Sequence, residues 1–496
     1  MCLRKQAPNC TLPKMDGHDE KQAIDVETTA TTCETTIDPA AEKRLVRKLD
    51  LWLSPMMVVV FLVAYLDRSN IGNAAIAGMN EDLNLTGSQL NVAVTVFYVT
   101  YITFEIPSSL ILKAARPSRL IPAFIILWSL VVIGSAFMKN YATLLATRLL
   151  LGAFESGLFP CLTVYLSTFY KPTEQAQRVS YLFVASALSG AFGGLLAYGL
   201  TRLNGALEGW RWLFLVEGLI SVAVGIACFL LLPDNFEKAW WLNENDKKLM
   251  RIRNRQAAIY QGESETFDRE EVKLAFKDGK VWLSAFCQFC ANTCSFGFST
   301  FLPTIIRGFG FSSVKTQLLT VPVYIWASVF YLAIAFFSDL ARRRAFFMVP
   351  LALITAIGYA MMLSVDMHRT AILYFATFVT ATGIYCCVGL NVTWNSNSNA
   401  GYYKRATAIG LQQTVGNSAG ILAGQIYRIT DSRGRYVIGH GVSLAAIVCA
   451  ALGYCGIYLV LKCINERREN MDIVEQQKLI DAGVKGDRHP HFRYTL

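Results

Sequence analysis

The stretch Leu51-Trp-Leu-Ser-Pro-Met-Met-Val-Val-Val-Phe-Leu-Val-Ala-Tyr-Leu-Asp67-Arg68 is almost wholly apolar until its last two residues, an acid and a base. Placing a charge inside the hydrocarbon of a bilayer costs about 2.5–3.5 kcal/mol on insertion scales, so such residues persist where they have a partner, a water-filled cavity or a function. A second apolar stretch contains Arg148 and Glu155. Two acids and two bases in one half of the chain predict a site for a proton and an organic anion.

The composition is that of a membrane protein. Of the 496 residues, 53% are hydrophobic and 17% are charged, and the mean hydropathy is +0.37; soluble domains carry roughly 25% charged residues. Apolar runs of about twenty residues, the length that a bilayer requires, recur along the chain. We predict an all-α integral membrane protein with twelve transmembrane helices, at about 52–72, 90–112, 119–138, 141–167, 179–201, 212–232, 281–303, 316–338, 345–364, 371–393, 406–428 and 437–462.

The longest interruption, 233–280, divides these spans six and six, which predicts two pseudo-symmetric six-helix bundles. The expected organisation is a disordered cytoplasmic tail (1–45), an N-terminal bundle (46–232), a cytoplasmic linker (233–280), a C-terminal bundle (281–463) and a cytoplasmic tail (464–496). Residues 236–256 of the linker predict a basic helix with two tryptophans, either lying on the inner leaflet or forming a solvated connector. Basic residues cluster in the loops after the even-numbered spans, so we expect both termini in the cytoplasm.

Several other classes of function are disfavoured. The net charge of +10 lies largely at membrane borders, so we expect a lipid bilayer and no nucleic acid as partner. Cys287-x2-Cys290-x3-Cys294 falls on one predicted span without a histidine, which favours packing cysteines over a metal site. The chain has no nucleotide-binding loop, histidine box or Ser-His-Asp order, so we expect no enzyme. Asn84-Leu-Thr86 is a possible glycosylation site.

Four segments resemble a known family. They are Tyr65-Leu-Asp67-Arg68-Ser-Asn70-Ile-Gly72-Asn73-Ala74, Arg148-Leu-Leu-Leu-Gly152-Ala-Phe-Glu155-Ser-Gly157-Leu-Phe-Pro160, the run from Trp394-Asn395 through Asn399-Ala-Gly401 to Lys404-Arg405-Ala406, and Arg435-Tyr436-Val-Ile-Gly439-His440-Gly441. From about residue 48 to 468 the chain resembles the major facilitator superfamily, specifically the fungal allantoate and nicotinate permease branch of the anion:cation symporters. The resemblance implies a monomeric plasma-membrane carrier of a small organic carboxylate, working by alternating access, with the proton as coupling ion and no cofactor.

The resemblance also implies roles for individual residues. Asp67 and Glu155 would carry protons, and Tyr65, Arg68 and Arg148 would bind the substrate. Arg148 and Glu155 are seven positions apart, so they lie within about 20° of one helix face, with Gly152 between them. Counting residues from the span ends places Asp67 and Arg148 at similar depth, and we expect that they can pair. The alternative is that the four form two structural salt bridges.

The remaining polar residues of the spans leave alternatives open. In the tenth span, Asn391, Trp394 and Asn395 could contact the substrate, because amides bond heterocycles and an indole stacks on them, or could hold helices together. Glu105 could line the cavity or bond backbone freed by a proline. Glu217 is expected to form a structural pair with a basic neighbour.

The turn after the eighth span contains Asp339, Arg342 and Arg343, which could gate transport or only fix topology. Two other functions remain possible on the same scaffold. One is export of an acidic fungal metabolite, and the other is nutrient sensing without transport.

Overall fold

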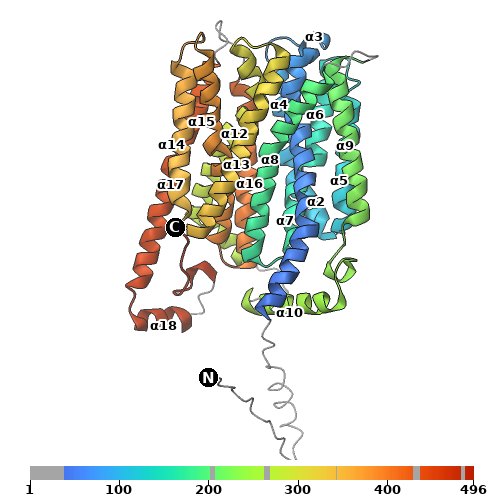
Figure 1. The fold of residues 1–496 in the computed structure, drawn as a ribbon. Coiled ribbons are helices and arrows are strands. Elements are labelled where there is room, and N and C mark those ends of the chain that lie inside the picture. Colours follow the sequence, from blue (N-terminus) through green and yellow to red (C-terminus); the bar gives the residue numbers. More distant parts are fainter. Residues whose placement is uncertain are drawn as a thin grey trace, which may run out of the picture.

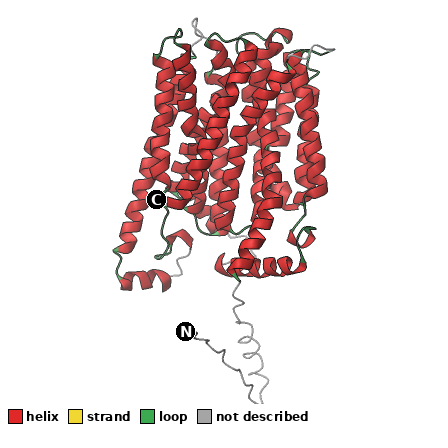
Figure 2. Ribbon diagram, in the orientation of Figure 1, coloured by secondary structure: helices red, strands yellow, loops and turns green. Residues whose placement is uncertain are grey.

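The computed structural model describes residues 38–114, 116–201, 207–261, 269–341, 343–427, 436–481 and 486–496. In these ranges every regular element is a helix (Figure 2). The predicted disordered tail lies largely outside the described residues. Its last part is helical, since the first described helix begins at Pro39, where Asp38 caps it by accepting a hydrogen bond from the amide of Ala40.

Each of the twelve predicted spans overlaps a helical segment over most of its length. The first six belong to α2 (Pro39–Ala74), α4 (Gln89–Ala114), α5 (Pro117–Ser135), α6 (Tyr141–Glu155) with its continuation α7 (Leu158–Ser167), α8 (Pro172–Leu200) and α9 (Gly209–Leu231). The last six belong to α12 (Gly279–Gly308), α13 (Ser313–Ala341), α14 (Arg344–Ser364), α15 (Thr370–Asn397), α16 (Tyr402–Ile426) and α17 (Val437–Glu469). Within the described residues, ten helical segments are long and apolar enough to cross a membrane; α4 and α16 are not among them.

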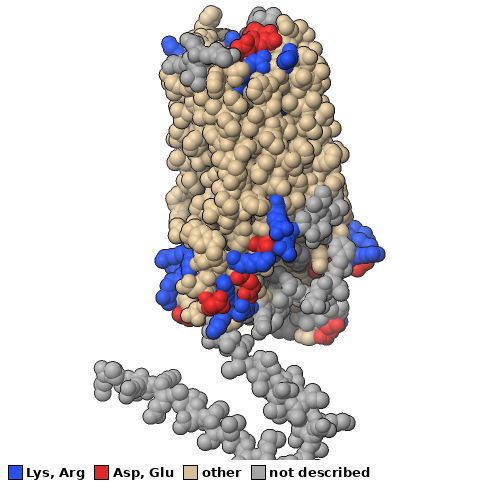
Figure 3. Space-filling model, turned by 90° about the vertical axis from the view of Figure 1, so that its right-hand side faces the viewer, with Lys and Arg blue, Asp and Glu red and all other residues tan. Residues whose placement is uncertain are grey.

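The surface has the two-zone character of a membrane protein. Figure 3 shows a broad band without charged side chains between two ends where Lys, Arg, Asp and Glu gather. The band carries exposed apolar side chains such as Leu230, 72% exposed, and Phe336, 66% exposed. A band of this kind matches the hydrocarbon core of a bilayer, with the charged ends in water.

The two ends of the bundle differ in what covers them. At one end, which we call the α3 end, α2 continues into η1 (Ala75–Met79) and α3 (Asn80–Asp82). At the other, the α10 end, lie α10 (Glu244–Gln261) and α18 (Ile473–Asp481) (Figure 1). Short elements α11 (Arg269–Lys277), η2 (Phe236–Lys238) and η3 (Gly486–Arg488) complete the described structure.

The predicted linker helix starts later than expected. Because α10 begins at Glu244, Trp240 and Trp241 precede it. Both rings pack on Trp52 of α2, with centroids 4.7 and 6.3 Å away, and the Lys48 ammonium binds Asp246 at 2.7 Å. These contacts join the linker to the first lobe at the α10 end.

The two six-helix lobes meet closely in the half of the molecule toward the α3 end. There α2 packs on α12, α4 on α16 and α8 on α13. A methyl group added to Gly72 would lie 2.1 Å from the carbonyl oxygen of Thr300, and one added to Gly420 would lie 2.2 Å from the ring of Tyr98. The amide of Asn91 donates across the lobes to the carbonyl of Gly424 at 2.7 Å.

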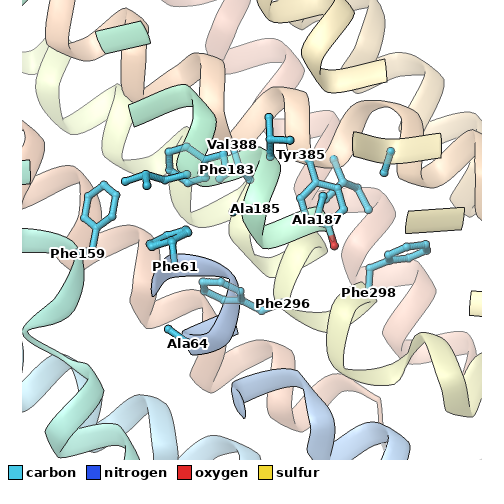
Figure 4. Close-up of a cluster of buried hydrophobic side chains, with 14 of the residues drawn as sticks. Phe61, Ala64, Phe159, Phe183, Ala185, Ala187, Phe296, Phe298, Tyr385 and Val388 are labelled. Atoms are coloured by element: carbon cyan, nitrogen blue, oxygen red, sulfur yellow. The ribbon is translucent and has the colours of Figure 1, made fainter. Parts of the chain in front are cut away.

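An aromatic cluster lies on the other side of the molecule's middle. Figure 4 shows Phe61, Phe159 and Phe183 close together, with Tyr385 and Phe296 of the second lobe beside them. The first three rings have centroids 6.0 to 6.4 Å apart. Because Phe61 precedes Asp67 and Arg68 on α2, which runs toward the α3 end, this cluster separates those charges from the α10 end.

Candidate substrate and proton site

The first ion pair of the site joins α2 to α6. The guanidinium of Arg68 binds one carboxylate oxygen of Glu155 through both Nε and Nη2, the former at 3.1 Å. Glu155 is 1% exposed, and its other oxygen has no hydrogen-bond partner in the described structure. The free oxygen is an acceptor that a proton could occupy.

Aromatic rings hold Arg68 in place. Its Cζ lies 4.6 Å from the ring of Tyr65, 4.8 Å from that of Tyr101 and 5.1 Å from that of Phe97. A cation over an aromatic face is stabilised by about 0.5–2 kcal/mol. The rings from α4 approach because α6 has Gly152 at the contact, where a Cβ would lie 2.3 Å from the carbonyl of Phe97. Gly152 was predicted only to lie between Arg148 and Glu155, and the two aromatic residues of α4 were not predicted. Binding of substrate by Tyr65 stays a prediction.

Arg148 is the second guanidinium of the site, and no carboxylate of the described residues forms an ion pair with it. It is 2% exposed, and its Nε has no hydrogen-bond partner among the described residues. Its Cζ lies 5.8 Å from the ring of Phe214 on α9. A guanidinium presents a planar set of donors that suits a carboxylate, so Arg148 has the chemistry to bind one.

The carboxylate of Asp67 is hydrogen-bonded to α5 and α9 and forms no ion pair with Arg148 in the described structure. Its Oδ2 accepts hydrogen bonds from Trp128 at 3.2 Å and from Ser221 at 2.8 Å, while Oδ1 has no partner in the described structure. The expectation that Asp67 and Arg148 pair is therefore wrong in this conformation. Neighbouring residues of a helix point about 100° apart, so Asp67 faces the lobe interior when Arg68 faces Glu155.

Glu217 lacks the basic partner that was expected for it. It is fully buried on α9, and neither carboxyl oxygen has a hydrogen-bond partner in the described structure. The charged group that acts on it is Asp67. The expected structural ion pair of Glu217 is thus corrected to a carboxyl–carboxyl neighbourhood.

The cavity between the two guanidinium groups is narrow. It is lined by Arg68 and Arg148 of the first lobe and, among others, Thr300 of the second, and its volume is about 10 Å³. A volume of this size holds about one water molecule. A substrate therefore requires the lobes to move apart before it can reach both cations.

The three polar residues predicted in the tenth span do not border this cavity. Asn391 is fully buried and donates to Gln288 at 2.8 Å and to the carbonyl of Ser284 at 3.0 Å. Asn395 donates to Gln412 at 3.0 Å. These amides join α12, α15 and α16, which matches the alternative that they hold helices together; a contact with substrate stays a prediction.

Trp394 lies at the α10 end of its helix. Its indole N–H donates to the carbonyl of Thr495 at 2.7 Å, so it is covered by the segment 486–496, which we call the C-terminal strap. Asn395 and Trp394 line a second small cavity together with Lys280. The structure thus separates these two residues from Arg68 and Arg148.

The predicted gating turn contains one ion pair. Arg344 donates to Asp339 and, at 3.1 Å, to the hydroxyl of Ser338. Arg343 is exposed, and Arg342 lies outside the described residues. The predicted gating set therefore omitted Arg344, the residue that Asp339 binds.

In the first lobe, the corresponding turn joins α4 to α5, and residues 113–119 contain no acid. An acid from elsewhere in the chain binds there. Asp234, which follows α9, accepts hydrogen bonds from Ser118 and, at 2.8 Å, from Lys238. These two bonds hold the pKa of Asp234 below its ordinary value. The sequence did not predict that Asp234 binds this turn, because four helices, α6 to α9, lie between Ser118 and Asp234 in the chain.

Two further predicted residues do not line the small cavity. Glu105 of α4 is buried and accepts a hydrogen bond from Asn417 of α16 at 3.4 Å, and this bond joins the two lobes. Asn84 is exposed at the α3 end with a backbone φ of 51°, and its glycosylation stays a prediction.

Comparison with known proteins assigns the family. The Major Facilitator Superfamily model matches residues 57–424. The chain is 44% identical over 466 residues to "Uncharacterized transporter C11D3.18C" of Schizosaccharomyces pombe, covering 94% of this chain and 92% of that protein. It is 36% identical over 489 residues to the "High-affinity nicotinic acid transporter" of Saccharomyces cerevisiae, covering 96% and 90%.

A solved structure supports the same fold. The crystal structure of the D-xylose-proton symporter superposes with a TM-score of 0.64 at 15% identity, covering 82% of this chain and 97% of that one. At this identity the likeness concerns the fold alone. The twelve-helix fold and the match over most of the chain lead to one conclusion: the chain belongs to the Major Facilitator Superfamily and is a multi-pass membrane transporter.

Proposed function

We propose that this transporter carries a small organic carboxylate together with protons, by alternating access of its two lobes, as a member of the anion:cation symporters. The observation that carries the proposal is Arg148, a buried guanidinium beside the cavity with no bound anion. The relative named for nicotinic acid, at 36% identity, supports a carboxylate of that size.

The coupling follows from the ion pair. A carboxylate that enters the cavity reaches Arg148 first and then competes with Glu155 for the Arg68 guanidinium. A carboxyl group that loses its cation in a nonpolar cavity favours the protonated form. Binding of the anion therefore favours uptake of a proton by Glu155, and the summed charge of the two arginines, Glu155 and the substrate then stays at +1, as in the empty site.

The proposed orientation places the α10 end in the cytoplasm. Lys48, Lys171 and Arg178 lie there, and loops rich in basic residues stay on the cytoplasmic side. We propose a monomer in the plasma membrane, taking up substrate. If two protons accompany a monoanion, the net positive charge gains about 2.3 kcal/mol per 100 mV of membrane potential.

Uptake into liposomes tests the proposal. With purified protein and nicotinate as first probe, followed by other small acids, we expect accumulation when the outside is acidic and none when a protonophore is present.

Arg148→Gln should abolish uptake, and Arg148→Lys should reduce it at least tenfold, because an ammonium lacks the planar donor pair. Arg251→Gln, which removes an exposed guanidinium bound to Glu237, is the matched control and should leave uptake unchanged. Uptake indifferent to the proton gradient, or full activity in Arg148→Gln, contradicts the proposal.

A further inference from the structure

Asp67 and Glu217 form a buried carboxyl pair that the coupling through Glu155 does not use. Ser221, which donates to Asp67, lies one turn beyond Glu217 on the same face of α9. Glu217 and Ser221 are both fully buried, and Asp67 is 1% exposed. The two carboxyls therefore share the interface of α2, α5 and α9.

Three carboxyl oxygens of this pair have no hydrogen-bond partner among the described residues, namely Oδ1 of Asp67 and both oxygens of Glu217. An ionised carboxylate without donors in a nonpolar interior is strongly unfavourable, and a protonated one is far less so. Two neighbouring carboxyls can also share a proton, so that one stabilises the ionised form of the other. The free oxygens are the atoms on which such a proton would reside.

One cation faces this pair from the surrounding helices. From α2, Arg68 is bound to Glu155; from α9, Arg211 is bound to the carbonyls of Ala136 and Met138. The facing parts of α5 and α8 contain no charged residue between 120 and 135 or between 179 and 200. From α6 come Glu155 and Arg148, whose charges both act on Asp67.

We propose, on the basis of the proposed function, that Glu217 is a second proton-binding residue of the transport cycle and shares its proton with Asp67. In the empty carrier the pair holds one proton, and its single negative charge balances the cation of Arg148. When the substrate anion neutralises Arg148, a proton from water binds the remaining carboxylate and both carboxyls become neutral. The donor is hydronium: one of its O–H bonds breaks, one O–H bond forms on the carboxyl oxygen, and a water molecule is left. Release of the proton on the other side of the membrane is the reverse transfer to water.

The alternative is that Glu217 stays protonated throughout and only packs. Glu217→Gln separates the two, because an amide has the shape of a protonated carboxyl but cannot release a proton. The number of protons taken up on substrate binding is measured with a pH-indicator dye in weak buffer. In Glu217→Gln we expect that number to fall, or the pH at which uptake is half-maximal to shift by about one unit, a tenfold change in proton affinity. Ser129→Ala removes a buried hydroxyl of α5 that bonds the carbonyl of Ile125, and it is the matched control.

Infrared spectroscopy gives a readout that does not depend on transport. Without substrate, the carbonyl band that disappears in Glu217→Gln should lose intensity as the pH rises between about 4 and 9, where buried carboxyls titrate. A band of constant intensity, or proton uptake unchanged in Glu217→Gln, overturns the proposal. If the band titrates but the wild type shows no proton-linked uptake, the proposed symport fails and the proton site stands. If Glu217→Gln does not fold, Glu217→Asp should shift the same band, and an unshifted band overturns the proposal.

Discussion

Arg68 and Arg148 differ in what already binds them. The first is held by Glu155 and three aromatic rings, whereas the second has no hydrogen-bond acceptor at its Nε in the described structure. For the two guanidinium groups beside one small cavity we therefore propose different tasks: Arg148 would attract the anion, and Arg68 would transmit its arrival to Glu155. The division depends on the ion pair being breakable by a competing carboxylate.

Glu155→Gln tests this division at the level of one residue. The amide oxygen can still accept from Arg68, so binding and exchange of substrate across the membrane should persist. Accumulation driven by a proton gradient should fall at least tenfold, because the amide does not take up a proton. Counterflow and gradient-driven uptake, measured on the same liposomes, separate the two; equal losses in both would contradict the assignment.

The sequence predicted internal positions for these charges, and Asp67, Arg148 and Glu155 are indeed buried, but it did not predict which of the charges pair. Their depth in the membrane stays a prediction. Depth follows from the rise of 1.5 Å per residue, which every helix shares. Pairing depends on how each helix is rotated about its axis, and the sequence around Asp67 and Arg148 does not indicate that rotation. The aromatic residues around Arg68 were missed for a similar reason, because Phe97 and Tyr101 resemble ordinary lipid-facing residues in sequence.

Helices α2 and α12 approach without intervening side chains at Gly72. We expect Gly72→Ala to force them apart and to destabilise this conformation by about 1–3 kcal/mol, as overpacking of a filled interior does. The melting temperature and the initial rate of uptake should both fall. Gly134→Ala on α5, where an added methyl group meets no atom within 4 Å, is the control and should leave both unchanged.

Helices α12, α15 and α16 are joined by the amide network of Asn391, Asn395 and Gln412. Asn391→Ala should lower the stability by about 0.6–1.7 kcal/mol, the measured range for single polar contacts between membrane helices. If Asn391 only joins helices, KM for the substrate stays constant while the melting temperature falls. A raised KM at unchanged melting temperature would support the predicted contact with substrate.

The helices themselves were the part most readily predicted. Twelve apolar runs sufficed for their number because the bilayer fixes a common length. The sequence did not indicate that the fourth span breaks into α6 and α7 near Ser156, or that α10 begins only after the two tryptophans. Such boundaries depend on packing against neighbouring helices.

The C-terminal strap connects elements that are distant in the chain. Asp487 is 3% exposed and binds the ammonium groups of Lys280 and Lys404 at 2.9 and 2.7 Å. Tyr494 binds Asn465 of α17, and the carbonyl of Leu496 accepts from the amide of Arg344. Sequence analysis predicted only a cytoplasmic tail from 464, because the partners of Asp487 lie far away in the sequence.

The strap should respond to pH in a defined direction. Burial opposes the charged form of Asp487, but Lys280 and Lys404 outweigh it and hold the pKa below its ordinary value of 3.8. Docking is therefore stable above that value and is lost as the pH falls below it. Fluorescence of Trp394, isolated by comparison with Trp394→Phe, should change in that acidic range and stay constant from about pH 5 to 8.

Substitution of Asp487 tests the docking of the strap in a second way, by its cleavage with trypsin. Asp487→Asn leaves two buried ammonium groups with less compensating charge, so the docked form should lose about 3–5 kcal/mol. Trypsin should then cleave after Arg488 and Arg493 much faster than in the wild type. Asp481→Asn, at the end of α18, is the control. Equal cleavage rates would show that the strap is held by its other contacts.

The contacts between the lobes at the α3 end have a consequence for the environment in which the carrier works. Gly72, Gly420 and the amide of Asn91 meet carbonyls or a ring, all of them neutral. A charged group takes part too, since the guanidinium of Arg307 donates to the carbonyl of Ile76 at 3.3 Å. Dissolved ions weaken attraction between charges and leave neutral contacts unaffected. With that end facing outward, the three neutral contacts should therefore keep their strength at any external salt concentration.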